Sequence, residues 1–176
     1  MKILNRCDMN NTKWCFVFSY IVLIGTALIM LPGCKGAKEL PTKKIRQKLR
    51  EFGGLELPRK ANGLRAILSH SRDPGIFVRF ETDSEGIEHV LKTFGKPGTK
   101  SKTLDPNDFK EMKKFGGRLF PQPCQWQEMV GVRLFDQESV ESGRLLEYMA
   151  PRFNEVGYEV FIDDKTNTVY VHAYFK

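Results

Sequence analysis

The stretch YEVFIDDKTNTVYVHAYF, residues 158–175, decides the fold. Tyr158–Ile162 and Val169–Phe175 are rich in β-branched and aromatic side chains, which favour strands. The residues between them, Asp163–Thr168, are polar and rich in turn formers. This pattern predicts a β-hairpin near the end of the chain.

Two further extended segments lie upstream, at residues 63–72 and 75–82, and Asp73-Pro74-Gly75 forms a turn signal between them. In the second segment Ile76, Val78 and Phe80 share one side, because side chains alternate along a strand. The alternation predicts a strand with one face buried.

Three stretches have the apolar spacing of helices. Thr42 is a candidate N-cap for the first, in which Ile45, Leu49 and Phe52 form a narrow apolar stripe. This helix could dock on the domain or lie against an anionic headgroup layer, and we favour docking or partial order because the stripe holds only three large residues. The second follows a cap at Asp83 or Ser84, and the third starts with Asp105-Pro106.

Other segments are less regular in their pattern. Residues 96–104 (KPGTKSKTL) indicate a surface loop. Residues 119–126 contain so many prolines that we expect no helix or strand there. Residues 130–135 are a candidate strand, whereas 144–149 fit either a strand or a helix.

Together these elements predict an α+β fold, a mainly antiparallel sheet with two to three helices packed on one face. We expect this small domain to span residues 63–176. Residues 34–62 would form a basic tether with a short amphipathic helix, and residues 1–33 a leader.

The leader combines a basic start with an uncharged, largely apolar run, Trp14–Leu31. Its flanking charges predict export of the rest of the chain. Eighteen residues are long for the core of a signal peptide and short for a membrane-spanning helix. Length alone therefore leaves cleavage and a permanent anchor both open.

The residues after the run, Leu31-Pro32-Gly33-Cys34, resemble the lipobox of bacterial lipoproteins, although Pro32 departs from the usual small residue at its position. The resemblance covers only the leader and Cys34. It implies cleavage before Cys34, lipid on its sulfur and a membrane location. In lipoproteins of bacteria with two membranes, Asp directly after the lipidated Cys tends to keep the protein at the inner membrane. Here that residue is Lys35, so the resemblance favours the outer membrane if the cell has one. An uncleaved single-span anchor and ordinary cleaved secretion are the alternatives.

The net charge of +7 is unevenly distributed. Residues 35–50 contain seven basic residues against one acid, and residues 92–118 contain eight against three. Such clusters suit an anionic polymer, a lipid surface or nucleic acid, and they also occur on ordinary solvated surfaces. Export disfavours nucleic acid as the partner.

Cys124 is the one thiol outside the leader and Cys34, and a nearby His would make it a candidate nucleophile. None of His70, His89 and His172 lies in a local motif that places it beside Cys124. We expect a small apolar role for Cys124 and a solvated position for His89. The cluster of Ser69, Ser71 and Asp73 around His70 favours turn capping over a catalytic triad.

Asp163-Asp164 also fits a turn better than a metal site. Tyr170, His172 and Tyr174 share one face of the last strand, which is either a ligand-facing surface or one covered by other elements. We favour cover. Further candidates for an aromatic groove are Trp126, Tyr148 and Tyr158.

No phosphate loop, dinucleotide fingerprint or hydrolase motif occurs, and nothing predicts a cofactor or metal. The leading hypothesis is a non-enzymatic lipoprotein module of the cell envelope that binds a protein, peptide or glycan. The alternatives are a periplasmic hydrolase using Cys124 or a His-centred site, and a domain on an uncleaved helix that binds an anionic polymer or lipid.

Overall fold

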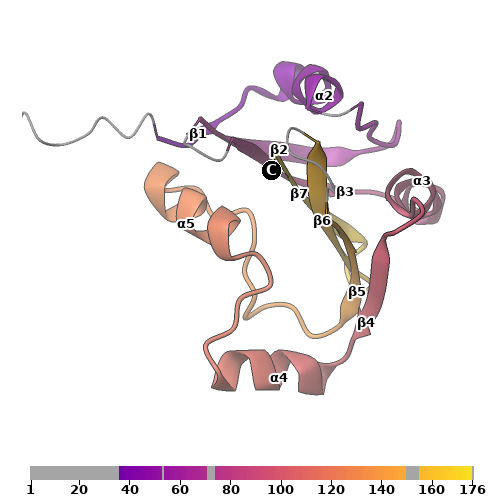
Figure 1. Ribbon diagram of the computed structural model, residues 1–176, viewed down its shortest axis with the longest axis vertical. Coiled ribbons are helices and arrows are strands. Elements are labelled where there is room, and N and C mark those ends of the chain that lie inside the picture. The colour runs from indigo at the N-terminus through magenta and orange to yellow at the C-terminus, as the bar shows by residue number, and fades with distance from the viewer. Residues whose placement is uncertain (1–35, 53, 71–73, 150–154, 176) are drawn as a thin grey trace, which may run out of the picture. The chain divides into compact units, whose positions relative to one another are not determined.

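One antiparallel sheet organises the chain in the computed structural model, which describes residues 36–52, 54–70, 74–149 and 155–175 (Figure 1). The strand order within these residues is β1-β2-β3-β7-β6-β5-β4. The strands are β1 (Lys38–Glu39), β2 (Asn62–Ser69), β3 (Gly75–Glu81), β4 (Lys100–Leu104), β5 (Gly143–Tyr148), β6 (Val156–Asp163) and β7 (Thr168–Phe175). The helices are α2 (Thr42–Glu51), α3 (Ser84–Phe94), α4 (Pro106–Lys114) and α5 (Pro121–Val130).

The hairpin predicted at the end of the chain is confirmed as β6 and β7, which pair from Val156↔Phe175 to Asp163↔Thr168. Its turn is held by Asp163, whose carboxylate accepts hydrogen bonds from Lys165 N at 2.9 Å and from Thr166 Oγ1 at 2.8 Å. Asn167 has a left-handed φ of 53°, which Asn tolerates better than most residues. The turn thus rests on local polar groups.

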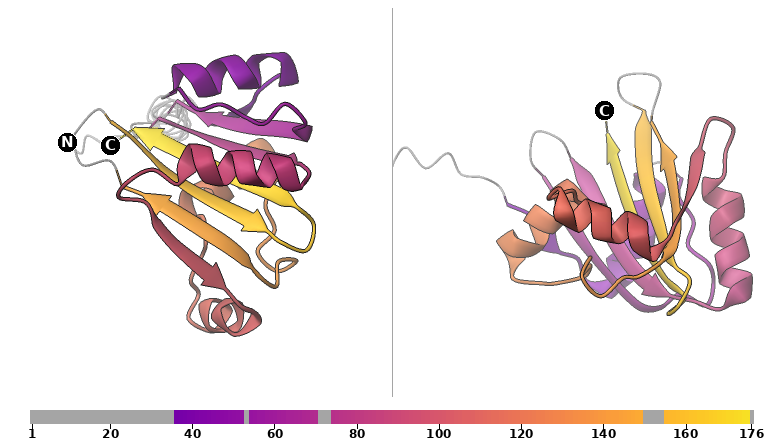
Figure 2. Two further views of the ribbon diagram at one scale, coloured as in Figure 1. Left: turned by 90° about the vertical axis from the view of Figure 1, so that its right-hand side faces the viewer. Right: turned by 90° about the horizontal axis from the view of Figure 1, so that it is seen from below.

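The sheet is covered on both faces, so the expectation of helices on one face is wrong (Figure 2). On one face, α2 and α3 bury Ile45, Leu49, Val90 and Phe94 against the strands. On the other face, α4, α5 and residues 131–140 cover a second cluster that includes Phe77. The expected α+β class, mainly antiparallel, holds.

The reason for the error lies in β3. Ile76, Phe77 and Val78 are all fully buried, so apolar side chains point from this strand into both clusters. Polar residues alternate with apolar ones only near the end of the strand, at Arg79 and Glu81. Its position between β2 and β7, away from either edge, explains the burial on both sides.

The predicted docking of the first helix is confirmed, because Ile45 and Leu49 of α2 are fully buried in the same cluster as α3. Thr42 is the first helical residue and Pro41 the N-cap, with no side-chain cap. Residues Lys35–Lys176 form one compact unit, so α2 belongs to the domain that was expected to begin at residue 63.

The cap signals predicted for α3 and α4 are confirmed, whereas the cap predicted at Thr42 is wrong. Asp83 accepts from Gly86 N at 3.0 Å at the start of α3. At the start of α4, Asp105 accepts from Asp108 N at 3.0 Å, and Asp108 accepts from Asp105 N at 2.9 Å. This capping box satisfies backbone donors that a helix start leaves free.

Two segments form regular elements that were not expected. Residues 119–126 contain the start of α5, because Pro121 and Pro123 lie in the first turn, where no backbone donor is needed. Residues 100–104, expected as loop, form the edge strand β4. Residues 144–149, left open between helix and strand, lie largely in β5.

Residues 130–135 do not form the expected strand, since Val130 ends α5 and residues 131–135 pair with no described strand. Their backbone is held by the buried side chain of Gln127, whose Oε1 accepts from Leu134 N and Phe135 N. Its Nε2 donates to Phe135 O at 3.1 Å. A side chain of α5 therefore replaces a neighbouring strand as the partner of this segment.

Within the described residues, no helix has the length and apolar character needed to cross a membrane. The apolar run Trp14–Leu31, the lipobox-like residues and Cys34 lie outside the described residues.

Candidate functional site

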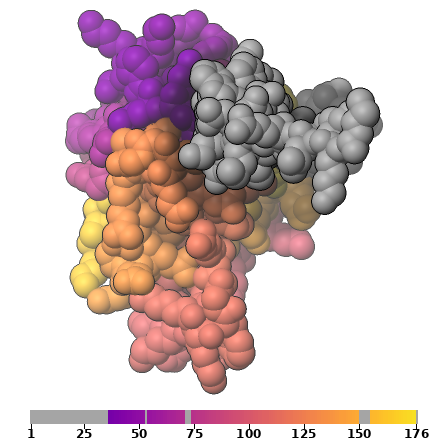
Figure 3. All heavy atoms as spheres, turned by 90° about the vertical axis from the view of Figure 1, so that its left-hand side faces the viewer, coloured from indigo at the N-terminus to yellow at the C-terminus, as the bar shows by residue number. Residues whose placement is uncertain are grey.

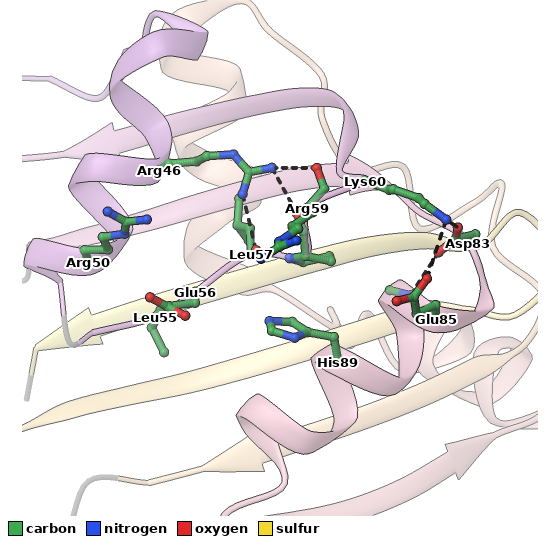
Figure 4. A pocket seen from close by; sticks show the side chains of 12 residues that line it. Arg46, Arg50, Leu55, Glu56, Leu57, Arg59, Lys60, Asp83, Glu85 and His89 are labelled. Atoms are coloured by element: carbon green, nitrogen blue, oxygen red, sulfur yellow. Dashed lines mark hydrogen bonds and ion pairs between the residues drawn. The ribbon is translucent and has the colours of Figure 1, made fainter.

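The larger of two prominent pockets has a volume of about 680 Å³ and lies where α2, residues 55–60 and α3 meet (Figure 4). This size suits a small ligand or one group of a larger ligand. Four basic residues (Arg46, Arg50, Arg59 and Lys60), three acidic residues (Glu56, Asp83 and Glu85) and His89 contribute to the lining.

Arg46 shapes the pocket from α2. Its guanidinium donates to Pro58 O at 2.9 Å, Leu57 O at 3.2 Å and Arg59 O at 3.4 Å. These neutral carbonyls hold the loop of residues 55–60 in place but leave the positive charge of Arg46 uncompensated. Arg46 is therefore a structural residue that also makes the pocket more positive.

The opposite rim is closed by Lys60, whose Nζ lies 2.8 Å from Asp83 Oδ2 and 3.5 Å from Glu85 Oε2. The hydrogen bond to Asp83 raises the pKa of Lys60, and the same bond, with that from Gly86 N, lowers the pKa of Asp83. Both side chains are exposed, so the pair positions the loop on α3 with only a small stabilising effect.

Three side chains of the lining, Arg50, Arg59 and His89, have ring or guanidinium nitrogen atoms without a protein partner in the described part of the chain. Among the described residues, the side chains of Arg50 and Arg59 form no hydrogen bond or ion pair. The Nε2 atom of His89 is buried and also has no partner. Figure 4 shows the His89 ring extending from α3 toward the loop, with Arg50 on the α2 side. Within the described residues, Glu56 is the one acid of the lining without an ion pair.

His89 was expected on the solvated side of its helix, and this expectation is wrong. The helix pattern was assigned correctly, since Ile87 and Val90 are buried as predicted. The packing of α2 and its following loop over α3 partly buries His89 as well. This long-range contact is not visible in the periodicity of residues 84–94.

The second pocket, about 610 Å³, contains Cys124 beside Arg118, Glu128 and Arg133. Burial raises the pKa of the half-buried Cys124 thiol, and Glu128 raises it further against the opposing effects of Arg118 and Arg133. No histidine is found in the lining of this pocket as far as the chain is described. A raised pKa keeps the thiol protonated and poorly nucleophilic.

The expected cover of Tyr170 and His172 is confirmed. Both are more than 90% buried, and Trp126 of α5 packs edge-on against His172 at 5.3 Å between ring centroids. Phe135 packs in the same way on Tyr170 at 4.9 Å. Tyr158 lies in the other cluster, so the aromatic residues form no single groove.

The remaining candidates do not assemble into a site. His70 is exposed at the end of β2, and Ser71 and Asp73 lie outside the described residues. Asp164 is bound by Arg144, with its Oδ1 2.7 Å from Nη2. No cluster of three or more His, Cys, Asp or Glu suited to a metal occurs in the described part of the chain.

Comparison of the chain with protein-family models, with curated proteins and with solved structures found no match. The pocket must therefore be interpreted from its own chemistry. Sequence reasoning noted Arg46 and Arg50 only as part of the basic residues 35–50, and it passed over Arg59. The signal that could have indicated the pocket is the pair Arg50 and Arg59, which lie before and after the largely apolar residues 55–58.

Proposed function

We propose that this chain is a membrane-tethered binding module whose pocket between α2, residues 55–60 and α3 takes an anionic group of its ligand. The observation that supports this best is that two exposed arginines, Arg50 and Arg59, line one cavity with the buried His89 Nε2, and that none of the three has a protein partner among the described residues. Guanidinium groups bind phosphate and carboxylate through paired, charge-assisted hydrogen bonds. A ligand that carries either group would satisfy these donors.

The tether is the second part of the proposal. A basic start, an apolar run and the lipobox-like Leu31-Pro32-Gly33-Cys34 support export and lipid attachment at Cys34, with the outer membrane favoured in a cell that has one. Radiolabelled palmitate should enter the wild-type chain and not Cys34→Ala. Labelling of neither chain, with no cleavage, would instead favour an uncleaved anchor.

The ligand class follows from the location. An exported domain meets phosphate groups on envelope polymers and lipids, and carboxylates on glycans and peptides. The pocket supplies recognition but, among the described residues, no nucleophile paired with a base lies in it. We therefore propose binding without catalysis. The hydrolase alternative, based on Cys124 or a His-centred site, gains no such supporting geometry.

The test is a titration of the full chain in dodecyl maltoside with inorganic phosphate in one arm and acetate in the other. Each charge-assisted hydrogen bond contributes about 1.5–3 kcal/mol, so Arg50→Ala and Arg59→Ala should each weaken binding by roughly tenfold or more. Arg133→Ala, an exposed arginine in the other pocket, is the matched control. Binding that is unchanged in both pocket variants would refute the proposed site.

A further inference from the structure

Phe115 is the most exposed of the large apolar side chains in the described residues, at 78%. It is the C-cap residue of α4, and Lys114 Nζ lies 5.4 Å from the centre of its ring. Gly116 follows with a φ of +67° and turns the chain away from the helix. Phe115 therefore projects from the end of α4 without an apolar neighbour to cover it.

The chain around Phe115 is rich in basic residues, while Asp136 and Glu138 lie in the pocket that Lys113 and Arg118 help to line. Lys110, Lys113, Lys114 and Arg118 are all exposed, and with Phe115 we name them the α4 tip. Within the described residues none of these four cations has an ion-pair partner, and Lys113 Nζ contacts only a carbonyl, Glu138 O, at 3.4 Å. The nearby Asp108 is already paired with Lys102 at 2.8 Å. Glu111 is the remaining acid of the helix.

An aromatic ring surrounded by cations is suited to one kind of partner. At a lipid surface, lysines and arginines attract anionic headgroups, and an aromatic side chain enters the boundary between headgroups and acyl chains. Nucleic acid would also pair with the cations, but a single ring without a groove of further stacking residues adds little to its binding. The combination therefore favours lipid.

We propose that the α4 tip is a second membrane contact, which binds anionic lipid headgroups and inserts Phe115 among them. This inference rests on the proposed tether, since the apolar run ends five residues before Gly36 and so keeps Gly36 within ~17 Å of the membrane edge. In Figure 3 the residues of α4 form one end of the visible face and the first described residues lie at the other end, and β4, which leads into α4, is the sheet edge opposite β1. Contact at the tip would hold the other side of the sheet, with α3, away from the lipid.

The experiment places the photo-crosslinker p-benzoyl-phenylalanine at position 115 of the full chain, with Glu88 of α3 as the control position. Both sites are exposed, and α3 lies on the opposite side of the sheet (Figure 1). The chain is mixed with vesicles of phosphatidylcholine, with or without phosphatidylglycerol, and lipid adducts are measured by mass spectrometry. Vesicle flotation is recorded in parallel.

We expect about tenfold more lipid adduct at position 115 than at position 88 in vesicles containing phosphatidylglycerol. Replacing Lys110, Lys113 and Lys114 together by Gln should lower the adduct at position 115 by about tenfold, because attraction to the anionic surface then disappears. Equal adduct at positions 115 and 88, or adduct at 115 that does not depend on lipid charge, would overturn the contact. Binding of duplex DNA that depends on these lysines, with no charge-dependent lipid adduct at position 115, would also overturn it.

The experiment tests the tether and the α4 tip independently of each other. A chain that floats with vesicles but gives no adduct at position 115 keeps its tether and refutes the α4 tip. A chain that does not float, yet gives charge-dependent adduct at position 115, supports the tip while it refutes the tether.

Discussion

Glu159 and His172 face each other across β6 and β7, and Glu159 Oε2 lies 2.9 Å from His172 Nδ1. Carboxylate oxygens accept hydrogen bonds, so we assign Nδ1 as the donor in this pair. The imidazole is almost fully buried, with its side chain 5% exposed, and its Nε2 has no partner. Glu159 is thus the one hydrogen-bond partner of the His172 ring among the described residues.

The first prediction concerns this pair. Glu159→Ala removes the acceptor and leaves a buried donor unsatisfied, which should lower the free energy of unfolding by about 1–3 kcal/mol. Glu159→Gln keeps an acceptor oxygen and should lower the free energy of unfolding by less. Urea unfolding of the detergent-solubilised chain measures both. A stability loss as large in Gln as in Ala would show that the charge, and not the hydrogen bond, matters.

The second prediction concerns Gly86 in α3. Alanine is ordinarily better than glycine inside a helix by about 1 kcal/mol. Here an added Cβ would collide with Thr82 Oγ1 and lie 2.8 Å from Thr82 Cβ. We therefore expect Gly86→Ala to destabilise the fold by about 1–3 kcal/mol. Glu88→Ala, at an exposed position on the same helix, is the control and should be near neutral. A higher melting temperature for Gly86→Ala would contradict the packing of α3 on Thr82.

The third prediction concerns Arg46. Its removal takes away three hydrogen bonds to the carbonyls of residues 57–59, so Arg46→Ala should speed amide hydrogen exchange in residues 55–61 by about tenfold or more. Arg50→Ala, one turn further along α2, should leave this exchange unchanged because Arg50 makes no such bonds. Equal exchange in both variants would contradict the role assigned to Arg46.

The fourth prediction follows from Lys60 and Asp83. The lowered pKa of Asp83 gives stability that is present above the unfolded value, about 3.9, and is lost as the pH falls through the folded value. The raised pKa of Lys60 gives stability that is present below about 10.4 and is lost as the pH rises through the folded value. Lys60→Met should therefore be less stable than wild type near pH 7 and equally stable near pH 2. Unfolding curves at both pH values check this, and a difference that persists at pH 2 would assign the effect to packing of the Lys60 stem.

Local signals in the sequence predicted much of the fold. The hairpin of β6 and β7 and the caps at Asp83 and Asp105 depend on residues close in sequence, so their patterns were sufficient. The start of α5 was missed because prolines were taken as breakers, whereas Pro121 lies in the first turn. Strand β4 was missed because an exposed edge strand need not be apolar.

The candidate site depends on contacts that no local pattern contains. Arg50, Arg59 and His89 come from a helix, a loop and a second helix, which the packing of α2 against α3 brings together. Their charges were visible in the sequence, but their convergence was not. The same holds for the two covered faces of the sheet, which follow from the central position of β3.

The most direct test of the proposed binding site is the nuclear magnetic resonance signal of His89 Nε2 during a phosphate titration. If the pocket binds an anion, this signal should shift and saturate at about millimolar phosphate, since one anion held by a few charged groups gains only about 4 kcal/mol. The shift should be absent in Arg50→Ala/Arg59→Ala and present in Arg133→Ala. A His89 signal that is unmoved by phosphate and by acetate, or that moves equally in the double variant, would contradict the account.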